Sequence, residues 1–235
     1  MYPKIGRSLN FDPKIGDQLE KAYKILDDIE WDFSKLTAEN KKFFKQIGFD
    51  YENDEEGQYY DVLGPGDSWY NGDGPDSISA SSYLKSKDST INYLPQNAND
   101  LSFKTAWSEG VKGYGVGEYL VYYFKPLAPR ITTVIVANGY VKSEKAFREN
   151  SRVKKLKMYV RDKPVAILNL KDCRCEQIFE FEPIGRWKEY RNLDWKEVEK
   201  LPDWTMKFEI LEVYPGDKYD DTVISEIYFD GLDVL

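Results

Sequence analysis

From about Ser77 onward, apolar and polar residues alternate in short segments that are separated by Gly, Pro, Asn or Asp. A period of two is typical of strands that bury one face. The segments that fit it are 77–84, 118–124, 131–137, 154–160, 165–170, 177–181, 205–213 and 223–229. Eight short strands with turns between them predict a mainly β chain, folded as an antiparallel β-sandwich.

The first 49 residues have a helical period instead. Apolar residues recur every three or four positions over 19–29, and Asp17 with Glu20 predicts a capping box at the start of this helix. Thr37 predicts the start of a second short helix, and Gly48 predicts its end. Two short helices bury little surface, so we expect them to dock on the sandwich rather than form a separate domain.

An acidic, glycine-rich connector spans residues 50–76. Its Trp69 and Tyr70 have two interpretations: they fold the loop down, or they form an exposed binding platform. A further helical insertion is predicted over 187–200. We therefore divide the chain into a helical extension with its connector, 1–76, and a β-sandwich, 77–235.

The complete absence of histidine excludes a Ser-His-Asp triad, a Cys-His pair and a histidine-ligated zinc. Lys and Arg total 33 and Asp and Glu total 41, so the formal net charge is −8. This balance argues against binding to nucleic acid or to an anionic membrane surface, because both depend on Lys and Arg.

No apolar run approaches the roughly 20 residues that cross a bilayer, and the first ten residues lack the apolar centre of a signal peptide. Two interpretations stay open: a cytosolic protein, or an exported protein whose leader is absent from this chain. Cys173 and Cys175 lie on one face of a predicted strand, about 6.6 Å apart. This separation is near the upper limit for a disulfide, so we expect free thiols.

Several motifs occur in a fixed order after the connector. They read PQNAND and TAW within 95–107, WSEG and GVGEY within 107–119, ANGYVKS at 137–143, NSR at 150–152 and LEVYPGDKYDDTVISEI at 211–227. Together they resemble the discoidin-like domain found beside bacterial NAD glycohydrolases, a galactose-binding-like family described as an NADase-type glycan-binding or translocation domain. The resemblance covers about two-thirds of the chain and includes neither the helical extension nor a glycohydrolase domain.

This resemblance implies a jelly-roll sandwich, exported or at the cell surface, whose loops bind a glycan at one end. Aromatic faces that stack on sugar rings and polar groups that bond hydroxyls suit such a site. The candidate ligand-binding residues are Glu109, Tyr114, Asn138, Tyr140, Lys142, Arg152, Tyr214, Lys218, Tyr219, Asp220 and Asp221. Seven of them, Tyr140, Lys142, Arg152, Tyr214, Lys218, Tyr219 and Asp220, are expected to line one shallow pocket.

The same residues have structural interpretations. Trp107 is expected to pack in the core, and some of the tyrosines can do the same. Lys142 and Arg152 can instead pair with acidic residues of the 212–222 loop and hold the loops together. The glycines between 110 and 117 lack the strand–turn–helix setting of a dinucleotide site, so we expect a loop with positive φ angles.

The resemblance also implies a structural Ca²⁺ between the first loop and the last strand. The matching positions are Asp100, Thr105 and Glu226, while Ser102 stands where the family often has an acid. Calcium prefers six to eight oxygen ligands, so water and carbonyl groups would complete the set. In the alternative interpretation, Glu226 makes a salt bridge or a hydrogen bond at a strand end.

The residues and the resemblance are compatible with three classes of function. A non-catalytic carbohydrate-binding module is the leading prediction, and a protein-interaction module that uses the helical extension is the alternative. A glycoside hydrolase that uses two carboxylates is less favoured, because Asp220 and Asp221 are adjacent and would face opposite ways on a strand. We therefore expect no enzymatic activity.

Overall fold

A computed structural model describes residues 1–52, 64, 74–86, 88, 91–185, 190 and 192–232. The chain divides into two compact units, one of Met1–Asn10 with Ser68–Leu235 and one of Phe11–Asp67. The interpretations offered for Trp69 and Tyr70 fall outside the described residues.

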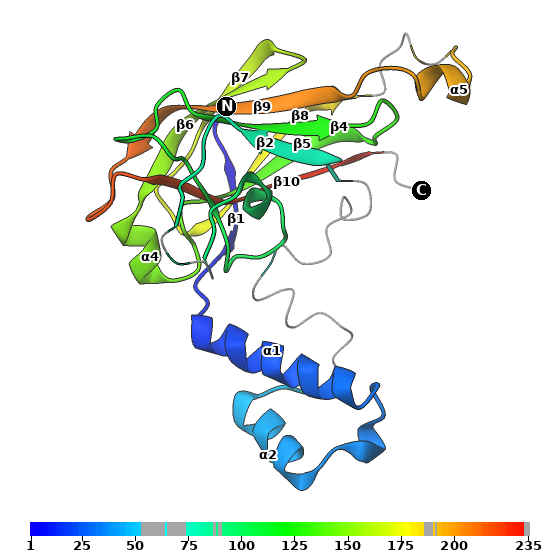
Figure 1. The fold of residues 1–235 in the computed structure, drawn as a ribbon, viewed down its shortest axis with the longest axis vertical. Helices are drawn as coiled ribbons and strands as arrows, with labels where there is room; N and C mark the ends of the chain where they lie inside the picture. Colours follow the sequence, from blue (N-terminus) through cyan, green and yellow to red (C-terminus); the bar gives the residue numbers. More distant parts are fainter. Residues whose placement is uncertain are drawn as a thin grey trace. The chain divides into compact units, whose positions relative to one another are not determined.

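The first unit consists mainly of strands (Figure 1). They are β1 (Lys4–Ser8), β2 (Ser77–Ala80), β3 (Trp107–Ser108), β4 (Tyr119–Phe124), β5 (Arg130–Asn138), β6 (Ser151–Val160), β7 (Lys163–Asn169), β8 (Cys175–Ile184), β9 (Trp204–Tyr214) and β10 (Thr222–Leu232). Each of the eight predicted strands coincides with one of them, although β2 ends four residues before the predicted limit. The strands β1 and β3 were not predicted.

The strands pair in the order β1-β8-β5-β10-β6-β9-β4-β2, with β3 on β10 and β7 on β6. The pairs are antiparallel except between β10 and β6, where Thr222 lies beside Ser151 for two residues in parallel. Rings from strands that are not paired meet in the interior, since Tyr122 of β4 lies 5.1 Å from Phe229 of β10. The ladder therefore folds into two facing layers, the discoidin-like β-sandwich that the sequence predicted.

The core follows directly from the period of two. In β4, Leu120, Tyr122 and Phe124 are buried, whereas the residues between them are half-buried on the other face. Phe124 stacks on Trp204 of β9 with 4.5 Å between ring centres. Trp107 is fully buried, and its indole N–H donates to the carbonyl of Ser82 at 2.9 Å, so its predicted core position is confirmed.

This unit also contains short helical segments. They are a 3₁₀ turn η2 (Pro95–Ala98), α4 (Glu144–Glu149) and α5 (Trp195–Val198). Asp194 and Glu197 form a capping box at the start of α5, which lies inside the predicted insertion. Residues 187–189 and 191 of that insertion lie outside the described part of the chain.

The second unit contains α1 (Pro13–Asp28), a 3₁₀ turn η1 (Phe33–Lys35) and α2 (Ala38–Ile47). Thr37 caps α2 and Gly48 ends it with a left-handed φ of 71°, as predicted. The predicted cap of α1 is wrong: Asp12 accepts from the backbone N–H of Lys14, and Pro13 occupies the first helical position. The buried residues Leu19, Ala22, Leu26, Leu36, Phe44 and Phe49 give this unit its own small core.

The two cysteines form a disulfide, so the prediction of free thiols is wrong. That prediction placed both residues on an extended strand. In the structure β8 begins only at Cys175, and Cys173 precedes it in a bend. The bend brings the two Cα atoms to 5.4 Å, well within the range of a disulfide. Among the described residues, no helix combines the length and the apolar character needed to span a bilayer.

Candidate ligand-binding site

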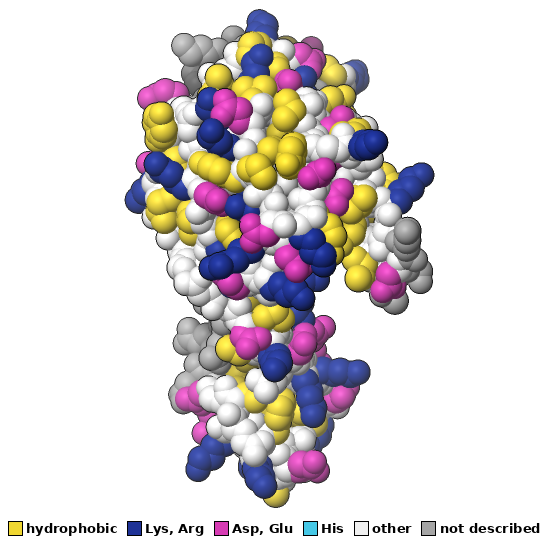
Figure 2. Space-filling model, turned by 90° about the vertical axis from the view of Figure 1, so that its left-hand side faces the viewer, with side chains coloured by type: hydrophobic (Ala, Val, Ile, Leu, Met, Phe, Trp, Pro, Cys, Tyr) yellow, Lys and Arg dark blue, Asp and Glu magenta, His cyan; other side chains and the backbone are white. Residues whose placement is uncertain are grey.

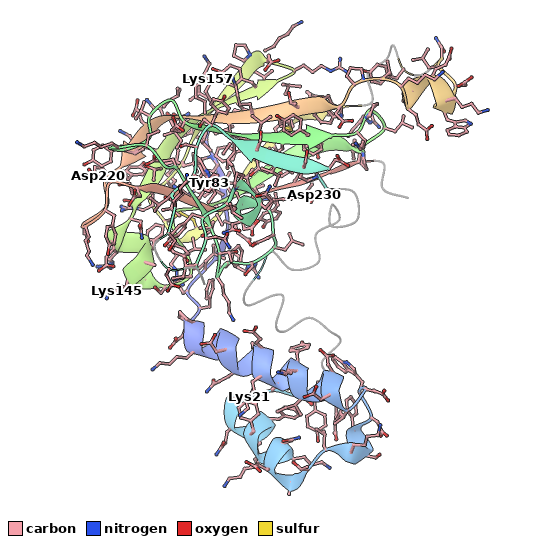
Figure 3. All side chains as sticks on the ribbon, in the orientation of Figure 1. Lys21, Tyr83, Lys145, Lys157, Asp220 and Asp230 are labelled. Carbon is pink, nitrogen blue, oxygen red and sulfur yellow. A yellow bond between two sulfur atoms is a disulfide. The ribbon has the colours of Figure 1, made fainter. Side chains whose placement is uncertain are left out.

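Three loops that are distant in sequence meet at one end of the sandwich. The strands β5 and β9 finish there, and β6 and β10 begin there, since Glu226 pairs with Ala137, Thr222 with Ser151 and Arg152 with Tyr214. The loops are 109–118, 138–152 and 212–222, and we call this the loop end. Figure 3 labels Asp220 at its tip, between β9 and β10.

Glu109 fixes the first loop from beneath. Its side chain is fully buried, and its carboxylate accepts from the backbone N–H of Val111 at 2.8 Å and of Thr222 at 3.2 Å. Burial raises the pKa of this carboxyl. Gly115 passes so close that a Cβ there would lie 2.4 Å from the Glu109 side chain. Glu109 therefore positions the loop and has no exposed surface.

The glycine-rich loop has the backbone that was predicted. Gly113, Gly115 and Gly117 have φ values of 94°, 62° and 96°. The hydroxyl of Thr222 donates to the carbonyl of Tyr114 at 2.8 Å, which ties the middle of this loop to β10. The Tyr114 side chain points outward and is 41% exposed, so its ring is available to a ligand.

Asn138 and Arg152 are buried and hold backbone in place. The amide of Asn138 accepts from the N–H of Val153 at 2.9 Å and donates to its carbonyl at 2.7 Å. Arg152 is 8% exposed and makes a bidentate pair with Asp172, at 3.0 and 2.8 Å. It also donates to the carbonyl of Pro215 at 3.1 Å. The structural interpretation of Arg152 named the wrong partner, because Asp172 was not singled out in the sequence.

Tyr140 is also mostly inside, at 7% exposed. Its hydroxyl donates to the carbonyl of Lys104 at 3.3 Å, and its ring meets the edge of Tyr93 at 6.2 Å. The Lys142 ammonium lies 4.5 Å from the centre of the Tyr140 ring. Tyr93 was missed, because it lies before the motifs that marked the loops.

The 212–222 loop presents exposed aromatic and charged groups. Tyr219 is 40% exposed, and the Lys218 ammonium lies 4.7 Å above its ring and 3.8 Å from the Glu149 carboxylate. Burial, followed by the neighbouring Asp220, raises the pKa of Asp221. Figure 2 views this side of the molecule and shows hydrophobic side chains interspersed with both signs of charge. A surface with aromatic, cationic and acidic groups suits a polar ligand.

Tyr214 and Glu212 contact the strands at the base of this loop. The hydroxyl of Tyr214 donates to the carbonyl of Leu170 at 3.1 Å. Glu212 pairs with Lys154 at 3.1 Å and with Lys155 at 2.5 Å, and these pairs lower its pKa. The loop end thus joins an outer set, Tyr114, Lys218, Tyr219 and Asp220, to an inner set of supporting residues.

Asp100, Thr105 and Glu226, the predicted calcium ligands, lie together. The Thr105 hydroxyl donates to both oxygens of Asp100, at 2.9 and 2.7 Å. The N–H of Ser102 donates to Glu226 Oε1 at 2.9 Å, whereas the buried Oε2 has no hydrogen-bond partner among the described residues. Burial, and then the nearby Asp100 carboxylate, raise the pKa of Glu226 well above its ordinary value.

An unpaired buried carboxylate oxygen beside a second carboxylate fits a hard cation. No cluster of three or more acidic, Cys or His side chains suited to a metal occurs in the described ranges, so these residues supply only two carboxylates. The Thr105 hydroxyl and the Ser102 carbonyl, 3.0 Å apart, offer further oxygen atoms. Water would complete the coordination.

Taken together, these observations describe a small β domain whose rigid sandwich presents exposed aromatic and charged side chains on the loops at one end. The family comparison makes this more specific. The sequence model of the NAD glycohydrolase translocation F5/8 type C domain matches residues 69–230, and the chain belongs to this family.

Solved structures with similar folds contain CBM32 domains of Clostridium perfringens. ZmpB, solved with its CBM32-1, CBM32-2 and M60 catalytic domains, is 12% identical with a TM-score of 0.47 over 70% of this chain and 15% of that chain. CpGH89CBM32-5, in complex with GalNAc-β-1,3-galactose, is 14% identical with a TM-score of 0.44 over 66% of this chain and 94% of that chain. No curated protein matches the chain.

Proposed function

We propose that this chain is a non-catalytic binding module that recognises a carbohydrate at the loop end. The observation that carries the proposal is the outer set of Tyr114, Lys218, Tyr219 and Asp220 on loops that Glu109, Asn138 and Arg152 hold from inside. An exposed ring offers a flat face to the C–H groups of a sugar, and the charged groups beside it bond hydroxyls.

Two carboxylates of the loop end are held in structural contacts, which favours binding over catalysis. Glu109 already accepts two backbone hydrogen bonds, and Glu212 is paired with two lysines. Asp220 is exposed and Asp221 is half-buried, both just before β10 begins at Thr222, so these adjacent carboxylates differ in their access to a ligand. Incubation with the glycans that bind, followed by product analysis, would expose any hydrolysis.

Two further points belong to this proposal. The Cys173–Cys175 disulfide favours an oxidising compartment, and hence an exported or surface-bound protein.

The unpaired, buried Oε2 of Glu226 supports a structural Ca²⁺ held by Asp100, Thr105 and Glu226. Its positive charge would stabilise the two carboxylates and fix the 100–105 segment against β10.

A second candidate is a protein-interaction module. The observation that favours it is the separate core of the helical unit, which gives the chain an element that is not needed to build the sandwich. A stable protein partner, together with no binding on a glycan array, would support this candidate over the first.

The test is a glycan array probed with the full chain and two variants. Tyr219→Ala removes an exposed ring at the loop end, so binding should fall at least tenfold while the melting temperature stays the same. Trp195→Ala is the matched control, because it removes a ring that is 60% exposed on α5 and should leave binding unchanged. Equal binding by all three proteins would contradict the proposed site, and an array without binding would contradict the proposed function.

A further inference from the structure

A concave site borders the loop end and shares α4 and Arg152 with it, and of the predicted ligand-binding residues its lining includes only Arg152. It is a cavity of about 730 Å³, within the size range of pockets that hold one small ligand. Its walls come from β1 with Asn10, from α4, from Arg152 and from the segment 171–175. The β1 wall lies outside residues 69–230, the part of the chain that matches the family model. We call it the cationic cavity.

The charge of this cavity is opposite to that of the chain. Four cations, Arg148, Arg152, Lys171 and Arg174, line it with two carboxylates, Glu144 and Asp172, although the net charge of the chain is −8. Arg148 pairs with Glu144 at 2.6 Å, and Arg152 pairs with Asp172 at 2.8 Å. The lining therefore carries two more positive than negative charges.

Arg174 is held rigidly in this lining. Its Nε donates to the carbonyl of Val141 at 2.7 Å, and its own carbonyl accepts from the N–H of Leu9 at 2.9 Å. The disulfide between Cys173 and Cys175 closes a small ring around it. Burial lowers the pKa of the Arg174 guanidinium, and the neighbouring Glu144 carboxylate offsets part of this effect. A bound carboxylate would act in the same direction as Glu144. A fixed guanidinium suits carboxylate recognition, because little side-chain entropy is lost on binding.

Apolar and neutral polar groups complete the walls. Ile5 is exposed, and the ring of Phe147 packs under the Arg152 guanidinium at 5.2 Å. Ser8 and Asn10, both exposed, add a hydroxyl and an amide. Such a mixture can contact the C–H face of a sugar ring and its hydroxyls, while the cations contact an acidic substituent.

We propose that the cationic cavity binds a sugar residue that carries a carboxylate, such as a hexuronic acid within a longer glycan. The inference rests on the proposed function and specifies its ligand class. Lys171 and Arg174 supply the charge that neutralises the carboxylate, and β1 supplies one wall.

The experiment uses the full chain and two oligosaccharides of equal length, trigalacturonate and neutral galactotriose, in calorimetric titrations. Trigalacturonate should bind at least tenfold more tightly than galactotriose. Lys171→Gln and Arg174→Gln should each weaken trigalacturonate about tenfold and leave any binding of galactotriose unchanged. Lys163→Gln is the matched control, because this lysine is exposed on β7, outside the cavity, and should have no effect.

Each outcome has one meaning. If both sugars bind with equal affinity and neither Lys171→Gln nor Arg174→Gln changes it, the cavity proposal is overturned. Loss of binding in Tyr219→Ala would then still support a glycan site at the loop end. If trigalacturonate binds with the same affinity to the wild type and to both variants, its carboxylates bind elsewhere and the proposal also fails. If neither sugar binds and the glycan array is also blank, both proposals fail. Lys171 is exposed, so Lys171→Gln keeps the test decisive even if Arg174→Gln does not fold.

Discussion

At the scale of single residues, the loop end contains two kinds of side chain. Some are buried and hold the loops in place, and others are exposed and accessible to a ligand. Glu109, Asn138 and Arg152 are buried and pair with backbone groups of neighbouring segments. Their loss would leave buried donors or acceptors unpaired, which costs about 1–3 kcal/mol for each group. Tyr114 and Tyr219 are exposed, so their loss should change binding more than stability.

Substitution of Gly115 tests how closely the first loop packs against Glu109. Gly115→Ala would place a Cβ 2.4 Å from the Glu109 side chain, at a φ of 62°. Gly113→Ala meets the same backbone restriction, at a φ of 94°, but has open space around it. We expect Gly113→Ala to cost about 1 kcal/mol from backbone strain and Gly115→Ala about 1–3 kcal/mol more from the steric clash. Equal urea midpoints for the two variants would contradict this packing.

Because Glu226 is buried, we expect the free energy of unfolding to depend on both pH and calcium. Below its ordinary pKa of 4.5 the carboxyl is neutral in the folded and unfolded states. As pH rises towards the elevated pKa of the folded state, only the unfolded chain releases the proton, so stability is lost. The loss is at most about 1.4 kcal/mol per pH unit for this one group.

Glu226→Gln is the matched variant, because its amide stays neutral. With a chelator present, the wild type should lose stability relative to Glu226→Gln between pH 4 and pH 8, as measured by urea unfolding. Calcium at a hundredfold excess over its dissociation constant should restore about 2.7 kcal/mol to the wild type. Asp100→Ala should remove this response. If neither calcium nor chelator changes the stability of the wild type, the proposed cation site is contradicted.

At the scale of elements, local pattern explains most of the fold. The eight predicted strands are long enough for their alternation to be visible, and they are confirmed. β1 was missed because Lys4–Ser8 has a glycine and two cations and no apolar alternation; it forms because it pairs with the edge of β8. The disulfide was missed for a related reason, since the bend before β8 leaves no clear signal in the sequence.

The start of α1 gives a prediction of its own. Asp12→Ala removes the side chain that accepts from the N–H of Lys14 at 2.9 Å, and should cost the helical unit about 1 kcal/mol. Asp17→Ala, at the position that the sequence indicated, should cost less than Asp12→Ala, because Asp17 lies inside α1 and does not cap its first turn. Thermal unfolding followed by circular dichroism compares them. A larger effect of Asp17→Ala would contradict the assigned cap.

At the scale of the whole molecule, the chain combines a β-sandwich with a helical unit. The sequence motifs predicted that the three loops converge, because each loop adjoins a strand end. They could not predict which side chains turn inward: Tyr140 and Tyr219 lie in similar glycine-flanked segments, yet one is buried and the other is exposed. That difference depends on contacts with distant residues such as Lys104 and Tyr93.

Docking of the helices on the sandwich stays a prediction. Because β1 belongs to the sandwich unit, the informative change replaces residues 11–67 with a glycine–serine linker and retains residues 1–10. If the helices dock, the shortened protein should melt several degrees lower than the full chain. An unchanged melting temperature for the sandwich would show that the two units are independent in stability.

The central claim is that a glycan binds at the loop end. The most direct measurement is an NMR titration of the full chain with the strongest glycan from the array, which follows every backbone amide. We predict that the largest shifts fall in residues 109–118, 138–152 and 212–222, and that Tyr219→Ala abolishes them. Shifts confined to residues 11–67 or to the α5 end of the sandwich, or no shifts at saturating glycan, would contradict the claim.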